Sequence, residues 1–525
     1  MAYSSHKLFF PLFAIFFSHT CIHSCNASTT YEIDIRSFCT TTPYPEVCFN
    51  SLNISSSIKT SPNINNYLLQ SLQVAISETT KLLNLFHNVG HSNIIEKQRG
   101  AVQDCRVLHQ STLASLERTL SGISSSNSMN IVDARTYLSA ALTNKNTRLE
   151  GLDSASGTIK PVQVKSVINT YKHVSNSLSI LSNPEMGTPE NQPLMGDPKW
   201  VSSSDHGLFQ DLDGEEYDPS EVLVVAADGT GNFTTITEAI NFAPYNSMDR
   251  TVIHVKEGIY KENVEIPLFK INLVMLGDGH HVTVITGNRS VGDGWTTFRS
   301  ATLAVSGNGF LARDIGFENS AGPEKHQAVA LRVDADSTAF YRCAIYGYQN
   351  TLYCDIYGTI DFIFGNAAVI LQACNIVTKT PMPGQFTVIT AQSRDSPNEN
   401  TGISIQNCII KAAIDLHSTS NSFKSYLGRP WKVYSRTVYL ESYIGDFIDP
   451  RGWTKWSNND QQGLDTLYYG EYDNYGPGSS TDNRVEWFGY HVMDYNDAYN
   501  FTVSEFINNG KNWLESTFFP YIDGI

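Results

Sequence analysis

The chain lacks several features that would point to particular functions. Lys and Arg number 36 against 52 Asp and Glu in 525 residues, which gives a formal net charge of −16. Such a shortage of positive charge argues against nucleic acid as a partner. No Cys-x-x-Cys pair occurs, so we expect no zinc site, and we expect no other metal and no cofactor. The composition, 41% hydrophobic and 17% charged, is that of a globular protein. The length of 525 residues is enough for two or three domains.

Long apolar runs are also missing, except at the N-terminus. Lys7 precedes a mostly apolar run over residues 8–17, and Cys25-Asn26-Ala27 offers a small-residue cleavage site. The pattern predicts a secretory signal over residues 1–27 that is too short to span a membrane. We therefore expect a secreted, extracellular protein with no membrane segment after processing. Weak signals for N-glycosylation follow at Asn53, Asn232, Asn288 and Asn500.

Cysteines are few and odd in number. Nine are present, and Cys21 and Cys25 fall in the signal, so 9 − 2 = 7 remain. An odd number in a secreted chain leaves at least one thiol without an intramolecular partner. Cys39 and Cys48 flank what looks like a disulfide-closed hairpin, and Cys343 and Cys354 could close a short loop. The full set of disulfide candidates is Cys39, Cys48, Cys343, Cys354, Cys374 and Cys408.

Helical and β-rich patterns occupy different parts of the chain. Apolar residues recur at helical spacing in four segments of residues 30–183, which predicts an antiparallel four-helix bundle. Residues 184–219 are rich in Pro, Gly and acidic residues and are expected to be a linker without a basic processing dipeptide. Residues 220–525 consist of short β-prone runs at spacings near 20-odd residues, without long helical patterns. This spacing favours a parallel β-solenoid, although periodicity alone leaves a β-sandwich open.

One acid lies in the middle of an apolar, β-prone run, Gly358-Thr359-Ile360-Asp361-Phe362-Ile363-Phe364-Gly365. An ionised carboxylate is costly there unless a partner holds it, and a held, desolvated carboxylate can act as a nucleophile. A lone Asp in such a run more often bonds backbone amides at a strand end. The catalytic interpretation is favoured by polar and aromatic residues in further distinctive blocks: Gln327, Gln349, Arg429 and Trp431.

Together these blocks closely resemble the plant pectin methylesterases, over about residues 224–519. Residues 30–183 resemble the invertase and pectin methylesterase inhibitor family. The resemblance implies a mainly β architecture, in which an all-α pro-region precedes a right-handed parallel β-helix over residues 220–525. It implies hydrolysis of methyl esters in cell-wall pectin (methyl-esterified homogalacturonan), with release of methanol. It also implies location in the cell wall and intramolecular inhibition by the bundle.

The resemblance also implies a role for each site residue. Asp361 would be the nucleophile, and Arg429 would hold its carboxylate ionised and oriented. Gln327 and Gln349 would donate to the oxyanion, and their separation of 349 − 327 = 22 residues is about one coil. The position after the second glutamine would supply the proton for methoxide. Thr297 and Trp431 would line the substrate groove, although a lone Trp is more often core or rim.

Two departures from the family pattern affect this site. The family carries Asp after the second glutamine, whereas this chain has Asn350, and an amide cannot exchange a proton at neutral pH. The interval 361 − 350 = 11 residues is shorter than the family's by roughly ten residues, or about half a coil. A third departure lies in the bundle, where Arg148 stands in place of the usual partner of Cys105, so Cys105 is the expected unpaired thiol.

Three interpretations follow from these residues. The chain is an active pectin methylesterase with reduced turnover, or a catalytically dead relative that still binds pectin. In the third interpretation the bundle is the functional part, inhibitory or chaperoning, and the β-helix is passive. Asp355 could substitute as the acid in the first interpretation, although its place beside Cys354 argues against that role.

Overall fold

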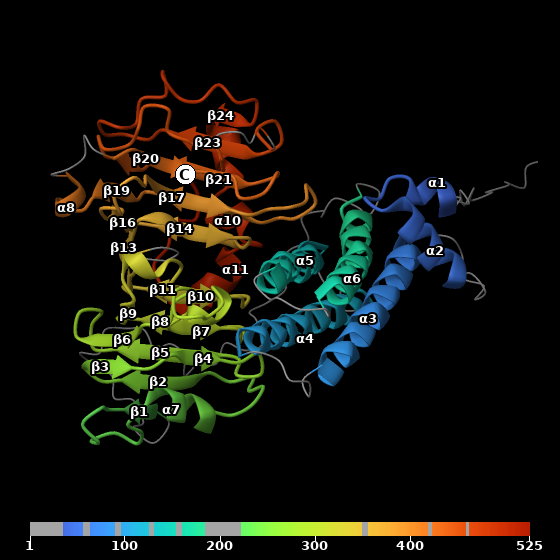
Figure 1. The fold of residues 1–525 in the computed structure, drawn as a ribbon, viewed down its shortest axis with the longest axis horizontal. Helices are drawn as coiled ribbons and strands as arrows, with labels where there is room; N and C mark the ends of the chain where they lie inside the picture. Colours follow the sequence, from blue (N-terminus) through green and yellow to red (C-terminus); the bar gives the residue numbers. More distant parts are fainter. Residues whose placement is uncertain are drawn as a thin grey trace, which may run out of the picture.

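The structure is a computed structural model, and it describes residues 35–55, 64–89, 96–124, 131–153, 160–183, 222–348, 355–417, 423–457, 461 and 463–525. The expected signal and linker therefore lie outside the described residues, as do Gln349, Asn350 and Cys354. A helical part and a part of parallel strands follow one another along the chain and lie side by side (Figure 1). This arrangement confirms the predicted fold class.

The helical part is an antiparallel bundle of long helices with a short N-terminal hairpin packed at one end. Leu68, Leu72, Leu138 and Leu178 belong to its buried core, which explains the apolar spacing of the sequence. None of the described helices combines the length and the apolarity that a membrane span requires. The helices are α1 (Ile35–Cys39), α2 (Pro45–Ser55), α3 (Ile64–Val89), α4 (Glu96–Ser124), α5 (Ile131–Asp153) and α6 (Lys160–Leu181).

Two of the three described cysteines of the bundle form a disulfide, and the third is a free thiol. A disulfide joins Cys39 to Cys48 across the α1–α2 hairpin, with Cα atoms 5.6 Å apart. Cys105 is a buried thiol, and Arg148 approaches it from α5. The Arg148 guanidinium donates from Nη2 to the Cys105 carbonyl oxygen over 2.8 Å and from Nη1 to the Tyr171 hydroxyl over 3.3 Å. A buried guanidinium with hydrogen bonds thus connects α4, α5 and α6 at this level of the bundle.

The strands stack as a parallel β-helix with three faces, because each coil contributes one strand to each face. One face is a continuous eight-stranded sheet. Each of the other two faces is split into two sheets. The continuous face contains β3 (Gly258–Lys261), β6 (Thr283–Gly287), β9 (Gly316–Asn319), β12 (Ala344–Tyr346), β13 (Asp355–Gly358), β16 (Asn375–Thr378), β19 (Ile409–Ala412) and β22 (Tyr443–Ile444).

The two split faces carry the remaining strands. The first consists of β4 (Val264–Ile266), β7 (Leu303–Val305) and β10 (Leu331–Val333), then β14 (Ile360–Gly365), β17 (Thr387–Gln392) and β20 (Ser425–Gly428). The second consists of β1 (Val222–Val225), β2 (Thr251–Val255), β5 (Leu273–Gly277), β8 (Leu311–Arg313) and β11 (Ala339–Tyr341), then β15 (Ala368–Gln372), β18 (Gly402–Gln406), β21 (Arg436–Leu440), β23 (Tyr468–Tyr472) and β24 (Tyr490–Val492).

Both splits occur at the same coil, where the sequence is short. Strand β12 pairs directly with β13, although only 355 − 344 = 11 residues separate their first residues. The neighbouring intervals on this face are 344 − 316 = 28 and 375 − 355 = 20 residues. Within the described residues, no strand lies between β10 and β14 or between β11 and β15. Within the described residues, this coil therefore has a strand on the continuous face alone, and the half coil expected to be missing stays a prediction.

Short helices cap and cover the β-helix. Helix α7 (Ile236–Phe242) lies at its N-terminal end, and α8 (Ile414–His417) follows β19. The C-terminal segment packs beside the second split face, where Phe519 contacts Tyr341 and the Ile522 backbone is hydrogen-bonded to Gln372. It contains α9 (Tyr495–Tyr499), α10 (Val503–Phe506), α11 (Lys511–Leu514) and a 3₁₀ turn (Glu515–Thr517); two other 3₁₀ turns lie at Phe298–Ser300 and Pro323–Lys325.

Three of the proposed disulfide cysteines are thiols in the structure: Cys343, Cys374 and Cys408. Cys374 and Cys408 occupy stacked positions before β16 and β19. Each thiol donates to carbonyl oxygens around it, the Cys374 Sγ to Gln372 and the Cys408 Sγ to Leu371 and Gln406. Hydrogen bonds to the coil backbone therefore take the place of the expected covalent link. Burial raises the pKa of the Cys343 thiol to about 12.

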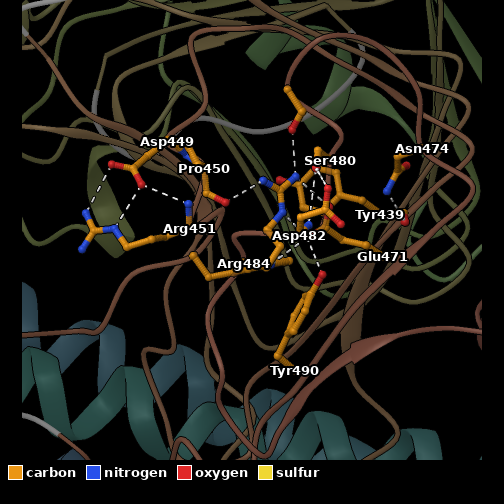
Figure 2. A network of polar contacts seen from close by, with 12 residues as sticks. Tyr439, Asp449, Pro450, Arg451, Glu471, Asn474, Ser480, Asp482, Arg484 and Tyr490 are labelled. Carbon is orange, nitrogen blue, oxygen red and sulfur yellow. Dashed lines mark hydrogen bonds and ion pairs between the residues drawn. The ribbon is translucent and has the colours of Figure 1, made fainter.

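A buried ion pair holds the C-terminal coils together (Figure 2). Arg484 donates from Nε and Nη2 to the two carboxylate oxygens of Glu471 over 2.8 and 3.0 Å, and both side chains are only 2% exposed. Trp453 Nε1 and the Tyr490 hydroxyl donate to the same carboxylate. Arg484 also donates to the carbonyl of Pro450. One carboxylate thus organises four segments of the chain.

We expect Glu471→Ala to destabilise the β-helix strongly, by about 3–5 kcal/mol, because it leaves the Arg484 charge buried and unpaired. Denaturant unfolding of the full-length chain measures the change. The matched control is Lys325→Ala, which removes an exposed ion pair with Asp293 and should have a far smaller effect because solvent screens that pair. Equal destabilisation by the two substitutions would contradict this account.

Candidate active site

Asp361 lies at an irregularity of β14. The register between β14 and β17 shifts between Ile360 and Ile363, and Asp361 has a φ of 50°. A residue in this left-handed region bends a strand and re-aims its side chain, and Asp is among the few non-glycine residues that tolerate it. The shift therefore explains how a polar residue fits in an otherwise apolar strand.

Arg429 meets Asp361 across the sheet. It follows directly after β20, and its backbone N–H donates to the Thr390 carbonyl of the intervening strand β17 over 3.0 Å. The guanidinium reaches back over β17 and donates from Nε and Nη2 to the two Asp361 oxygens over 2.8 and 2.5 Å. The Asp361 and Arg429 side chains are 12% and 15% exposed. This is the bidentate geometry that the sequence predicted for a held carboxylate.

Burial and charge act in opposite directions on Asp361. Burial raises the pKa of its carboxyl above the ordinary value, and the hydrogen bonds and charge of Arg429 oppose that rise. Arg429 is thus the group that favours the ionised form of the carboxylate.

Close packing fixes the position of Arg429. A Cβ atom on the preceding Gly428 would lie 2.2 Å from Thr390 Oγ1 and 2.9 Å from the Trp453 ring, so the backbone can approach β17 only with glycine. Trp453 is the residue that Glu471 holds through its indole N–H. The buried ion pair at the C-terminal coils therefore supports the strand end from which Arg429 projects.

Aromatic rings surround the ion pair. Trp431 stacks on Trp456, with centroids 6.0 Å apart and an interplanar angle of 12°, and Arg429 lies 4.3 Å above the Trp456 ring. Phe364 and Phe386 lie at 6.1 Å from Trp431 and 5.7 Å from Arg429. The sequence analysis named Trp431 but missed Trp456, Phe364 and Phe386. The spacing of 456 − 431 = 25 residues, about one coil, was the available signal for Trp456.

A cavity of about 1240 Å³ opens beside the ion pair. Gln327, Thr297 and Trp431 line it together with Asp361 and Arg429, so the structure brings these five sequence-predicted residues to one place. Gln349 and Asn350 lie outside the described residues. Asp355 also lines the cavity: it lies on β13 of the continuous face, accepts from Asn375 Nδ2 over 2.9 Å and lies 4.0 Å from His280 Nε2.

The helical bundle covers this cavity from the other side (Figure 1). Along α5, Lys145 pairs with Asp395 at 2.7 Å, Thr143 Oγ1 donates to the Asn366 carbonyl over 3.0 Å, and Arg135 Nε donates to the Asn398 carbonyl over 2.9 Å. Asn366 comes directly after β14, which carries Asp361. The groove that contains Asp361 is therefore bounded by α5.

Helix α4 makes a separate contact on the opposite side of the groove. Thr296 Oγ1 donates to Asp104 over 2.6 Å, and Arg299 lies 3.6 Å from the same carboxylate. Burial raises the pKa of Asp104 to about 6, and the contacts with Thr296 and Arg299 limit the rise. The hairpin of α4 and α5 thus straddles the groove, with one polar contact on each side.

Comparisons with known proteins agree with this arrangement. Residues 222–511 match the model of the Pectinesterase family, and residues 34–180 match that of the plant invertase/pectin methylesterase inhibitor family. The chain belongs to the pectinesterase family. It is 59% identical over 550 aligned residues to the probable pectinesterase/pectinesterase inhibitor 12 of Arabidopsis thaliana, with 100% of each chain covered.

Two further relatives extend this family assignment. Pectinesterase 2 of Citrus sinensis is 43% identical over 507 residues, which cover 94% of this chain and 95% of the relative. The solved structure of the pectin methylesterase from carrot is 50% identical with a TM-score of 0.57, and it covers 59% of this chain and 100% of its own. The pectinesterase part of the chain thus has the fold of a carboxylic ester hydrolase of known structure.

We expect Arg429→Gln to raise the pKa of Asp361 further, because the ionised carboxylate loses its charged partner while it stays buried. The carboxyl group then ionises only at higher pH. The ¹³C chemical shift of the carboxyl carbon, assigned with Asp361→Asn, follows this titration. Arg451→Gln, which removes the partner of Asp449 at an exposed site, is the control and should leave Asp361 unchanged. An unaltered Asp361 titration in Arg429→Gln would contradict the electrostatic role of Arg429.

Proposed function

We propose that this chain hydrolyses methyl esters of pectin with Asp361 as the nucleophile. The bidentate ion pair between Asp361 and Arg429, at the edge of a cavity with stacked tryptophans, is the observation that carries the proposal. A carboxylate that is desolvated, yet kept ionised and oriented by a guanidinium, is suited to attack an ester carbonyl. Flat tryptophan faces are suited to sugar rings.

Each remaining step can be assigned to residues. Asp361 attacks the carbonyl carbon, and the side-chain amides of Gln327 and Gln349 donate to the oxyanion that develops. Methoxide leaves, and water hydrolyses the mixed anhydride. Gln327 lines the cavity beside Asp361, which supports its role; the role of Gln349 rests on its sequence context. Thr297 and Trp431 are the proposed groove residues for the sugar chain.

Turnover is proposed to be slow. Asn350 cannot protonate methoxide, and a general acid typically contributes about 10²–10⁴ in rate. The short interval between β12 and β13, in which positions 349 and 350 fall, supports the same conclusion. The alternative is a pectin-binding relative without catalysis.

The proposed setting is the cell wall. The expected signal over residues 1–27 would direct secretion, and methyl-esterified homogalacturonan is the proposed substrate. The sequon residues Asn232, Asn288 and Asn500 are exposed, which supports glycosylation at these positions. The proposed domain limits are residues 30–183 for the bundle, 184–219 for the linker and 220–525 for the esterase.

The bundle is proposed to inhibit its own esterase. Contacts of α5 with the segments after β14 and β17, and of α4 with Thr296 and Arg299, lie on both sides of the groove. A polysaccharide chain in the groove would compete with this hairpin for the same space. Inhibition is therefore intramolecular and is relieved when the bundle moves away.

The proposed reaction is tested by methanol release from methylated pectin. The full-length chain should release methanol about 10²–10⁴-fold more slowly than the carrot relative, because it lacks the acid. Asp361→Ala should abolish the remaining release, whereas Asp449→Ala, which removes an acid outside the cavity, should not. Release by Asp361→Ala at the rate of the unmodified chain would show that another group is the nucleophile.

The proposed inhibition is tested by charge reversal at the contact with α5. Lys145→Glu should raise methanol release by roughly three- to tenfold, since it replaces attraction to Asp395 with repulsion in a partly exposed pair. The double variant Lys145→Asp with Asp395→Lys should restore inhibition. Lys81→Glu, whose partner Glu78 lies within the bundle, is the control. Cross-linking shows whether the bundle has detached in Lys145→Glu. A detached bundle with an unchanged rate would exclude inhibition by this contact.

A further inference from the structure

One carboxylate of the bundle is held by side chains of the esterase. Asp104 lies in the N-terminal half of α4, which passes beside β4 and β7 (Figure 1). Its Oδ2 accepts from Thr296 Oγ1 over 2.6 Å, and its Oδ1 lies 3.6 Å from Arg299 Nη1. The Asp104 side chain is only 5% exposed. A hydroxyl and a guanidinium of the esterase thus hold a carboxylate that comes from outside it.

The place where this carboxylate lies has an excess of positive charge. Three guanidinium groups of the esterase line a small cavity beside Asp104: Arg289, Arg299 and Arg332. We call these three residues, together with Thr296, the carboxylate corner. Glu265 lines the same cavity, and Asp334 lies 3.9 Å from Arg332 Nη1. Among these described groups one positive charge is left over, and Asp104 balances it.

The carboxylate corner also has hydrogen-bond donors that are not in use. Arg332 Nε and Nη1 are buried and donate to none of the described residues. The Arg332 guanidinium lies 3.5 Å from the centre of the Phe298 ring, and that of Arg289 lies 4.1 Å from the centre of the Trp295 ring. Guanidinium groups that aromatic rings hold in place recognise carboxylates with a fixed geometry. The corner is therefore prepared for an anionic ligand.

The carboxylate corner is continuous with the groove that contains Asp361. Arg332 and Phe298 line both the small cavity and the groove. Small apolar residues form a buried cluster that leads from the corner to Phe364, which lies on β14 with Asp361: Ala301, Ala304 and Val329. A polysaccharide that lies across Asp361 can therefore extend over these residues as far as the corner.

We propose that the carboxylate corner binds the free carboxylate of a galacturonate residue, and that Asp104 occupies the corner in its place. This inference rests on the proposed function, since it takes galacturonan as the chain in the groove. A carboxylate accepts from the same hydroxyl and guanidinium groups whether it belongs to an aspartate or to a uronate. The bundle thus competes with the polysaccharide for one particular charged subsite.

The test measures binding of trigalacturonate, which carries no ester, to the full-length chain by isothermal titration calorimetry. At pH 7.5 Asp104 is above its pKa of about 6 and carries its charge. Asp104→Asn should tighten binding about tenfold or more, because a ligand binds more weakly when its site is free in only a fraction of the molecules. The side chain keeps its size in this variant and loses only its charge.

Asp133→Asn is the matched control. It changes another carboxylate of the bundle at a contact with the esterase, where Asn508 donates to Asp133, and it leaves the carboxylate corner untouched. Binding should stay as in the unmodified chain. Both Asn variants are also measured together with Lys145→Glu, so that the contact of α5 does not keep the groove closed.

Two further comparisons test the charge and the donors. In the Asp104→Asn chain, Arg299→Gln and, separately, Thr296→Val should each remove most of the gain, about tenfold, because each removes a donor to the carboxylate. Arg451→Gln, at an exposed pair with Asp449, controls for the loss of a positive charge. The neutral triamide of the same trisaccharide should gain nothing from Asp104→Asn. Circular dichroism verifies folding of each variant.

Each outcome bears on the inference separately from the proposed function. The inference is overturned if Asp104→Asn gives no gain, if Asp133→Asn or the triamide shows the same gain, or if the gain survives both Arg299→Gln and Thr296→Val. Methanol release through Asp361 without this charge-dependent binding overturns the inference alone. Charge-dependent binding without methanol release supports the inference and contradicts the proposed function.

Discussion

The ion pair between Asp361 and Arg429 is the interaction on which the site depends. Removing two charges from water is expensive, and the pair is tolerated because its geometry satisfies both carboxylate oxygens. That geometry requires the register shift in β14, the close approach of Gly428 to β17 and the support of Trp453 by Glu471. Features far from the groove therefore determine whether Asp361 is held in this position. The chemistry proposed for this pectinesterase-family chain follows from a buried carboxylate that Arg429 holds and orients.

The interrupted coil leaves the parallel β-helix continuous along one face. Strands β12 and β13 pair directly, so one face remains continuous while the other two faces are split. The C-terminal segment packs beside one of the splits through Phe519 and Ile522. The catalytic ion pair is unaffected because Asp361 and Arg429 both lie in the sheet that begins after the interruption. In the proposed function, Asn350 and the short interval before β13 account for the absence of a proton donor.

Much of this architecture could be predicted from the sequence. Helical periodicity located the bundle, the apolar run drew attention to Asp361, and the resemblance to pectin methylesterases implied its pairing with Arg429. Local patterns could not reveal how many strands a short interval removes, because that depends on which neighbouring strands then pair. They also missed Trp456, whose role comes from stacking on Trp431 across a coil. From the sequence, Arg148 was noted only because it stands where the family has a cysteine. In the structure it is buried and connects three helices, through hydrogen bonds to a backbone carbonyl and to a hydroxyl distant in sequence, which local patterns do not reveal.

The most direct test of the central claim is to restore the missing coil. The claim is that the ion pair is intact and that only the proton donor and its supporting strands are absent. The residues between β12 and β13 are replaced with the corresponding coil of the carrot relative, and methanol release from methylated pectin is measured in the full-length chain. The account predicts a gain of about 10²–10⁴-fold over the unmodified chain. A repaired chain that folds but shows no gain, or an unmodified chain already as fast as the carrot relative, would contradict it.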